Sequence, residues 1–279
     1  MSSPSVPPTK PVLRGSAILI LWGNIDTLQT NEDALNDWWT NEHLRERLSL
    51  PGFNRARRYY NPNSQDCARQ YLALYEVSTL DDLASPQYMS ALNNPTPKTI
   101  QFMPCLAHMN RSACTVVASK SRPWGNPPPR KLPSTTPLTE KRIASVVFFP
   151  PSPTKEEEEP FICRIVGGFT HRLLGDSNVL SFHLIRQEEN ITLSGSSSKS
   201  YDGVRFEQES TTSVQDAQKH IALIEIDIPS IEDASSIVQK VVDSFLQEIE
   251  TFGARQVSWQ SYQPICSMDK NDITTDPAQ

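Results

Sequence analysis

The stretch Leu72-Ala-Leu-Tyr-Glu-Val77, followed by Thr79-Leu-Asp-Asp82, indicates how the whole chain is built, because it has a counterpart later in the sequence. The counterpart is Ile221-Ala-Leu-Ile-Glu-Ile226, followed by Ser230-Ile-Glu-Asp233. In each copy a short apolar run typical of a buried strand leads to a Ser or Thr with a carboxylate three residues later, which is typical of a helix start. Two matches in the same order favour an internal duplication.

The same kinds of element surround the first copy. The helical spacing of Leu35, Trp38, Trp39, His43 and Arg47 predicts a helix over 31–50, and Pro51-Gly52 ends it. The remaining pattern predicts strands over 16–22, 53–61, 70–77 and 110–119, and a second helix over 79–92. The order βαββαβ is that of a ferredoxin-like unit.

The second half follows the same order. Its pattern predicts strands over 143–149, 179–188, 220–228 and 255–266, and helices over 156–174 and 230–252. Each unit has helices on one face of its sheet, and the other apolar face must also be covered. We therefore expect an α+β fold in which two ferredoxin-like βαββαβ units pack sheet to sheet as a pseudo-dimeric α/β barrel, with a cavity between the sheets.

Proline-rich and polar stretches divide the chain. Proline fixes φ and removes a backbone donor, so the run of prolines after Ser121 predicts an extended linker. We expect a loose tail over 1–14, a first unit over 15–121, a linker over 122–140, a second unit over 141–268 and a loose tail over 269–279.

The composition excludes several classes of protein. The 279 residues are 37% hydrophobic and carry a net charge of −6, which argues for a globular chain and against a general nucleic-acid binder. No apolar run is long enough for a membrane span, and the N-terminus has no signal core. Five scattered cysteines without a CxxC pattern suggest reduced thiols. These features predict a cytoplasmic protein with no nucleic-acid or membrane partner.

One string of residues resembles a known group. It comprises Trp39-x-x-Glu42-His43-Leu44-x-Glu46-Arg47, then Pro51-Gly52-Phe53-x-x-Ala56-Arg57-Arg58-Tyr59, then Tyr71-Leu-Ala-Leu-Tyr75-Glu76. The string resembles the dimeric α/β-barrel superfamily, and within it the EthD-like proteins that are common in fungal and bacterial gene clusters. The second half fits only by strand pattern, because it lacks the Trp-x-x-x-His helix and the Pro-Gly-Phe turn. The resemblance implies the barrel fold, a role in secondary metabolism and a pocket in the first half.

His43 is the candidate catalytic residue. It follows Trp39 by four residues, so both lie on one helix face, and a histidine beside the cavity could act as a general acid or base. The alternative is a structural role, in which His43 hydrogen-bonds Glu42 or a backbone carbonyl and anchors the turn at Pro51-Gly52. The two alternatives stay open on the sequence.

The candidate substrate-binding residues surround this histidine in the sequence. An inward-facing Arg57 could hold a carboxylate or phenolate, and surface ion pairing is the alternative for the arginines near it. Tyr71 and Tyr75 share one strand face and could line an aromatic cavity or simply cover the sheet. The predicted substrate-binding set is Trp39, Arg57, Tyr59, Tyr71 and Tyr75.

No metal site or cofactor is expected from the sequence. The five histidines lie in separate predicted elements without HxH or HxxxH spacing, and the chain lacks Walker, GxGxxG and GxSxG patterns. The superfamily also contains haem-binding relatives, and a lone haem-ligating histidine stays open on the sequence.

The sequence predicts a cofactor-independent enzyme, a lyase, isomerase or monooxygenase acting on a small apolar molecule that is aromatic or polyketide-like. The alternative is a non-catalytic ligand-binding or assembly protein of the same fold, whose cavity is filled by Phe148, Phe149 and Phe182. The fused pair could be a monomeric pseudo-dimer or could form a homodimer.

Overall fold

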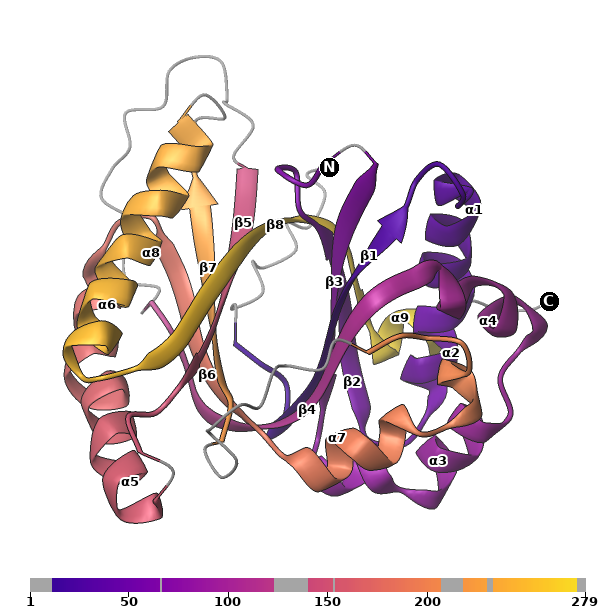
Figure 1. Cartoon of the computed structure of the whole chain (residues 1–279), viewed down its shortest axis with the longest axis horizontal. Helices are drawn as coiled ribbons and strands as arrows, with labels where there is room; N and C mark the ends of the chain where they lie inside the picture. Colours follow the sequence, from indigo (N-terminus) through magenta and orange to yellow (C-terminus); the bar gives the residue numbers. More distant parts are fainter. Residues whose placement is uncertain are drawn as a thin grey trace, which may run out of the picture.

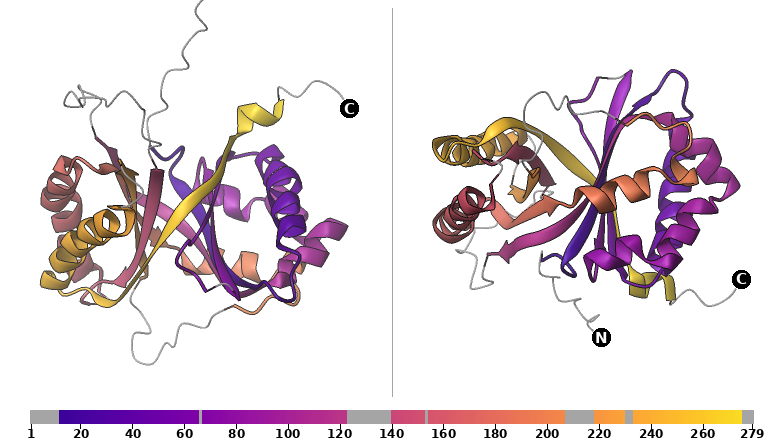
Figure 2. Two further views of the ribbon diagram at one scale, coloured as in Figure 1. Left: turned by 90° about the horizontal axis from the view of Figure 1, so that it is seen from above. Right: turned by 60° about the horizontal axis from the view of Figure 1, so that its bottom comes forward.

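The computed structural model describes residues 12–65, 67–122, 140–152, 154–206, 218–229 and 233–274. These residues form a closed barrel of eight antiparallel strands in the order β1-β3-β2-β8-β5-β7-β6-β4 (Figure 1). Helices cover the barrel on two opposite sides (Figure 2). The α+β fold with two fused ferredoxin-like units is therefore confirmed.

The first half has the strand order β4-β1-β3-β2 of a ferredoxin-like unit. Its strands are β1 (Ala17–Asp26), β2 (Phe53–Tyr60), β3 (Ala68–Val77) and β4 (Leu106–Ser121). One continuous helical stretch joins β1 to β2 and consists of α1 (Glu32–Asp37), a π turn (Trp38–His43) and α2 (Leu44–Ser49). Between β3 and β4 lie a 3-10 turn (Leu80–Ala84), α3 (Pro86–Asn93), α4 (Pro97–Phe102) and a second 3-10 turn (Met103–Cys105).

The sequence signals explain where these helices begin and end. The Asn31 side chain accepts a hydrogen bond from the Ala34 N–H at 3.0 Å, which caps the start of α1. Gly52 has a φ of +80°, a left-handed conformation that glycine adopts without strain, so the chain can turn directly into β2. The Asp82 carboxylate accepts from the Thr79 N–H at 2.8 Å, which completes the predicted capping box.

The second half has the matching order β8-β5-β7-β6. Its strands are β5 (Glu140–Phe149), β6 (Val179–Gln187), β7 (His220–Ile228) and β8 (Arg255–Asp269). The helical stretch before β6 consists of α5 (Lys155–Arg164), a π turn (Ile165–Phe169) and α6 (Thr170–Gly175). The long helix α8 (Ala234–Thr251) precedes β8, and three of the four residues of its predicted start, 230–232, lie outside the described part.

The two sheets join edge to edge as well as facing each other. β2 pairs with β8, and β4 pairs with β6, so that the edge strands of each half hydrogen-bond to the other half. The barrel therefore has no open sheet edge among its described strands.

A segment of the second half leaves its own unit and packs on the first. It contains α7 (Glu189–Ser196) and a 3-10 turn (Lys199–Tyr201). The Thr192 hydroxyl accepts from the Ala113 N–H at 2.9 Å, and the Ser200 hydroxyl donates to the Leu92 carbonyl at 2.7 Å. Gly195 permits this approach, because a Cβ there would lie 2.1 Å from a guanidinium nitrogen of Arg111. The sequence analysis predicts no element between residues 188 and 220, so it missed this segment.

Two expected boundaries need correction. Leu13 is 8% exposed and Arg14 donates its backbone N–H to Glu76 at 2.7 Å, so these residues belong to the folded unit. At the other end β8 runs to Asp269 and α9 (Lys270–Thr274) follows, with Lys270 Nζ donating to the Leu50 carbonyl at 2.6 Å.

Most of the predicted linker, residues 123–139, lies outside the described part. No described helix is both long enough and apolar enough to cross a membrane.

Candidate functional site

The predicted site residues lie on opposite faces of the first sheet. Successive side chains of a strand point to opposite faces, so Arg57 and Tyr59 of β2 point into the barrel, where Tyr59 joins the apolar cluster of its interior. Trp39 and Tyr75 belong to the cluster between the sheet and the helices. His43 lies with this second group, so the prediction that it faces the cavity between the two sheets is wrong.

A small pocket in the helix-covered layer of the first half brings several of these residues together. We call it the His43 pocket, and its space of about 10 Å³ holds about one water molecule. The polar and aromatic side chains that line it come from the first helical stretch, β3, α3 and the 3-10 turn after α7, and they are Trp39, His43, Arg47, Tyr75, Tyr88 and Tyr201.

The π turn places Trp39 and His43. Within it the backbone N–H of Leu44 bonds to the carbonyl of Trp39, five residues earlier. Such wide turns inside α-helices are rare and frequent at functional sites. The second half has a π turn at the corresponding place, but its sequence Ile165-Val-Gly-Gly-Phe169 carries no polar side chain that could do proton-transfer chemistry.

His43 is buried and its imidazole is neutral at neutral pH. The residue is 6% exposed, and its ring centre lies 4.9 Å from that of Trp38. Burial, followed by the charges of Arg47 and Arg58, holds the pKa of His43 well below its usual value. Its Nδ1 atom makes no hydrogen bond within the described part of the chain and lies 3.8 Å from the nearer Glu46 oxygen.

Arg47, one helical turn after His43, brings a cation to the same pocket. The residue is 3% exposed, and neither terminal guanidinium nitrogen has a hydrogen-bond partner among the described residues. One of them lies 3.4 Å from Glu46, and the guanidinium lies 5.9 Å from the ring centre of Tyr88. Burial raises the pKa of Glu46, and the charge of Arg47 opposes that rise. An unsatisfied buried polar group costs about 1–3 kcal/mol, so this arrangement suits a ligand that would complete it.

Arg58, and not Arg57, is the strand arginine that shares the layer with His43. Its guanidinium stacks 4.3 Å from the ring centre of Trp39 and donates to the Thr40 hydroxyl at 2.6 Å and to the Asn36 side chain at 2.7 Å. These contacts fix the Trp39 ring. Arg58 therefore positions the wall of the pocket.

The two predicted tyrosines of β3 have different roles. The Tyr75 hydroxyl accepts from Trp39 Nε1 at 3.3 Å inside the pocket, and burial raises its pKa. Tyr71 is not among the lining residues and hydrogen-bonds Glu32. Burial, followed by that hydrogen bond, raises the pKa of Tyr71 to about 12. The structure thus places Tyr71 beside the pocket and not in it.

The equivalent layer of the second half is mostly apolar. The strand registers match Arg58 with Leu184 and Tyr75 with Ile224. The rings of Phe148 and Phe182 lie 6.1 Å and 5.7 Å from that of Phe245 and fill the space under the helices. The polar residues of the His43 pocket have no counterparts there.

Arg57 belongs to a buried network of charges inside the barrel. Its Nε lies 3.0 Å from Glu76, and a terminal nitrogen pairs with Glu225. Glu76 and Glu225 are equivalent positions of the two repeats, 149 residues apart, and Arg55 also pairs with Glu76 at 2.8 Å. The residue equivalent to Arg57 is His183, which lies 3.9 Å from Glu225. Arg57 and Tyr59 therefore line a cavity of about 220 Å³ at one end of the barrel, separate from the His43 pocket.

The described residues do not fit a haem. The His43 pocket has space for about one water, far less than a porphyrin needs. In the second half the corresponding layer is filled by phenylalanines, and its buried His220 lies 3.3 Å from Glu158. In the part of the chain that the structure describes, no three His, Cys, Asp or Glu side chains gather as metal ligands.

Comparison with known proteins agrees with the architecture. No family model and no curated protein sequence matches the chain. A solved structure described as an anthrone oxidase-like protein matches it with a TM-score of 0.53 and 8% identity, over 94% of this chain and 98% of that one. The fold is that of the dimeric α/β-barrel proteins. A chlorite dismutase variant from Candidatus Nitrospira defluvii also aligns, with a TM-score of 0.44 and 12% identity, over 95% and 97% of the two chains.

Sequence reasoning missed three of the six polar and aromatic residues that line the His43 pocket. Arg47 is not among the predicted site residues, although its position one turn after His43 is a signal that could have selected it. Tyr88 lies on a predicted helix without a distinguishing pattern. Tyr201 comes from the other half of the chain, so no local pattern connects it to the pocket.

The environment of His43 predicts its titration. We expect the pKa of its imidazole to lie well below the ordinary histidine value, because burial and two arginines oppose protonation. Replacing Arg47 with methionine removes one of these charges and should raise the pKa of His43. Nuclear magnetic resonance of the labelled imidazole measures both. Titration at the ordinary value in the folded wild type would contradict the description of a dry, cationic pocket.

Proposed function

We propose that this chain is a cofactor-independent enzyme that moves a proton on a small apolar molecule bound in the His43 pocket. One observation carries the proposal: a neutral imidazole nitrogen and an arginine guanidinium, both buried and both without hydrogen-bond partners in the described chain, line the same small space. Together they provide a base and a positive charge, which are the two groups that proton abstraction needs.

The chemistry follows from the two groups. Nδ1 of His43 would take a proton from an acidic C–H or O–H of the substrate, and Arg47 would stabilise the anionic oxygen that results. The proton would return from the imidazolium to another atom of the substrate. Cyclases and isomerases need only these proton transfers. A decarboxylase also breaks the C–C bond to the carboxyl group, which leaves as carbon dioxide while the carbon takes up the proton. A cofactor-free monooxygenase would start with the same abstraction and then use dioxygen.

The walls of the pocket indicate the class of substrate. Trp39, Tyr75, Tyr88 and Tyr201 favour an aromatic ring, and this supports an aromatic or polyketide-like metabolite. The anthrone oxidase-like protein shares only the fold, so it supplies a first compound to test and no more. An EthD-like relationship, a role in secondary metabolism and a cytoplasmic location belong to the same proposal, as does a monomeric pseudo-dimer or a homodimer.

The small size of the pocket favours a second candidate function. A space of about 10 Å³ must widen before any ring can enter, so some of its lining side chains would have to move. If they do not move, the chain would be a non-catalytic ligand-binding or assembly protein that retains the fold.

The test uses two small molecules that lose a proton or carbon dioxide. Anthrone is a carbon acid, and its exchange with deuterium in heavy water without dioxygen reports proton abstraction directly. 2,4-Dihydroxybenzoate reports decarboxylation. Acceleration of either reaction by the purified protein supports the enzyme. Saturable binding of either compound without any reaction supports the ligand-binding alternative. The absence of both binding and reaction would contradict the enzyme and the ligand-binding function, and would leave the assembly protein.

A further inference from the structure

The interior of the barrel has a layered arrangement that the His43 pocket does not use. Inward-facing side chains alternate along each strand, and the middle of the barrel is filled by apolar residues such as Ile20, Leu72 and Leu223. The charged network of Arg57 lies at one end. At the other end mostly polar side chains surround a cavity of about 200 Å³ that we call the amide cavity, and Nζ of the buried Lys219 lies 5.5 Å from the ring centre of Trp22 beside it.

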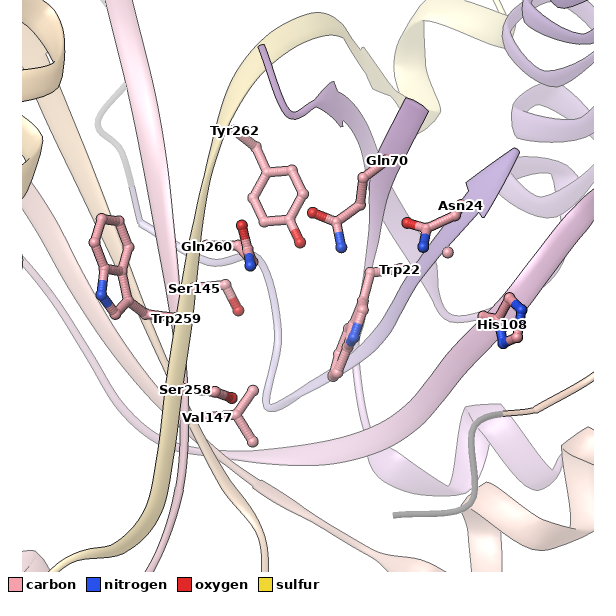
Figure 3. Close-up of a pocket in the computed structure, with 11 residues that line it drawn as sticks. Trp22, Asn24, Gln70, His108, Ser145, Val147, Ser258, Trp259, Gln260 and Tyr262 are labelled. Carbon is pink, nitrogen blue, oxygen red and sulfur yellow. The ribbon is translucent and has the colours of Figure 1, made fainter. Parts of the chain in front are cut away.

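The amide cavity is built by both halves of the chain. Trp22 and Asn24 of β1 and Gln70 of β3 face Gln260 and Tyr262 of β8 across it, with Ser145 and Ser258 between them (Figure 3). Figure 3 shows Trp259 on the opposite side of β8 from these side chains, in agreement with its packing against the helix-covered core. Ser258 and Gln260 are exposed while Ser145 and Tyr262 are buried, so the cavity has an open mouth and a closed floor.

One backbone contact fixes the orientation of the two glutamines. The N–H of Asn63 donates to Oδ1 of Asn61 at 2.9 Å, so that the amide nitrogen of Asn61 must point the other way. This nitrogen donates to the side-chain oxygens of Gln70 at 3.0 Å and Gln260 at 2.9 Å. Both glutamines therefore turn their NH₂ groups away from Asn61, and these groups have no partner among the described residues.

The remaining lining groups, His108 among them, add hydrogen-bonding capacity. Of the lining residues that the structure describes, none is Asp, Glu, Lys or Arg. The side chains of Asn24, Ser145, Ser258 and Tyr262 make no hydrogen bond to other described residues, and burial raises the pKa of Tyr262, which keeps its hydroxyl protonated. Amides and hydroxyls of this kind both donate and accept.

We propose that the amide cavity binds a single uncharged ring that carries several hydroxyl groups, a monosaccharide or a cyclitol. Hydroxyl groups donate and accept as the lining amides and hydroxyls do, and the rings of Trp22 and Tyr262 offer apolar surface to a C–H face. The volume is below the roughly 300 Å³ at which sites for drug-sized ligands begin, so the ligand is one ring. No Asp or Glu lies among the described lining residues, so a cationic ligand would find no carboxylate partner in the lining.

The amide cavity is independent of the proposed catalytic pocket. Leu19, Leu21 and Tyr75 line the His43 pocket from one face of the first sheet, while Trp22 and Gln70 line the amide cavity from the other face. Binding of a neutral ring should therefore be unaffected when His43 is replaced by glutamine, and failure of one proposal leaves the other standing.

The test follows the indole N–H of Trp22 by nuclear magnetic resonance, with the signal assigned by a Trp22→Phe variant. The full chain is titrated with D-glucose, D-galactose, D-xylose and myo-inositol, and we expect a saturable shift with at least one of them at a Kd of about 1 mM or below. Gln70→Leu and Gln260→Leu should each weaken this binding about tenfold, because each removes a hydrogen-bond donor. Gln247→Leu, at an exposed position on α8, should leave it unchanged.

A second variant distinguishes loss of binding at the cavity from loss of binding through misfolding. Ser258 is exposed, so Ser258→Tyr should block the mouth of the cavity without disturbing the core, and binding should disappear. Two results would overturn the proposal: no saturable shift with any of the four compounds, or equal affinity in the wild type and Ser258→Tyr. Uracil is titrated as a comparison compound. Saturation by uracil alone would also overturn the proposal, because it would indicate that the cavity binds a flat heterocycle.

Discussion

Replacing Arg57 with leucine is expected to lower the free energy of unfolding by about 3–5 kcal/mol, the usual cost of breaking a buried ion pair. Arg57 is 7% exposed and lies between two buried carboxylates, those of Glu76 and Glu225. After the replacement, Glu76 would still form its ion pair with Arg55, whereas the nearest basic group to Glu225 would be His183 at 3.9 Å. Chemical denaturation of both proteins at neutral pH measures the difference.

Two further variants separate the loss of the pair from the loss of side-chain packing. Arg57→Leu combined with Glu225→Leu removes the stranded carboxylate and should recover part of the stability. Arg172→Leu breaks a surface pair with Glu248, where the arginine side chain is 64% exposed, and should cost no more than about 1 kcal/mol. A cost that small for Arg57→Leu would contradict the importance of the barrel network.

The same network predicts how stability depends on pH. Burial alone would raise the pKa of Glu225, but the charge of Arg57, helped by His183, holds it well below the usual range. A carboxylate with a lowered pKa contributes stability above its unfolded value of about 4.3, and loses it as the pH falls toward the folded value. The difference in the free energy of unfolding between the wild type and Arg57→Leu should therefore be largest at neutral pH and become smaller below about pH 4.

His43→Gln is expected to slow the deuterium exchange of anthrone by about 10²–10⁴-fold, the usual contribution of a general base. Arg47→Met should slow it about 10²–10³-fold, because the developing anion would lose its charged partner. Because the two groups act in one step, the double variant should lose less than the product of the two single effects. Initial rates with each folded variant measure these changes.

The control is His171→Gln, which changes an exposed histidine on α6 in the second half. It should exchange anthrone at the wild-type rate. If the His43→Gln protein were folded and as fast as the wild type, then His43 would have only a structural role, which is the alternative that the sequence leaves open.

The sequence predicts the fold well because its signals are local. Alternation, capping residues and the repeat of Leu72–Val77 at 221–226 define the elements of both units and their equivalence. The site is predicted less well, because strand alternation alone does not say which face of β2 meets the first helical stretch. Arg57 was chosen and Arg58 is the one beside Trp39. Tyr201 could not be predicted, because it reaches the His43 pocket through a segment that crosses from the other half.

This crossing segment has a consequence for how the protein is made. Residues up to Ser121 contain all the strands of the first unit, and they leave the ribosome before Tyr201 has been synthesised. Until then the growing chain presents an uncovered aromatic recess and two unpaired strand edges, β2 and β4. The nascent first half is therefore the form of the chain to which we expect a chaperone to bind. The His43 pocket is covered only after the segment that contains Tyr201 has been translated.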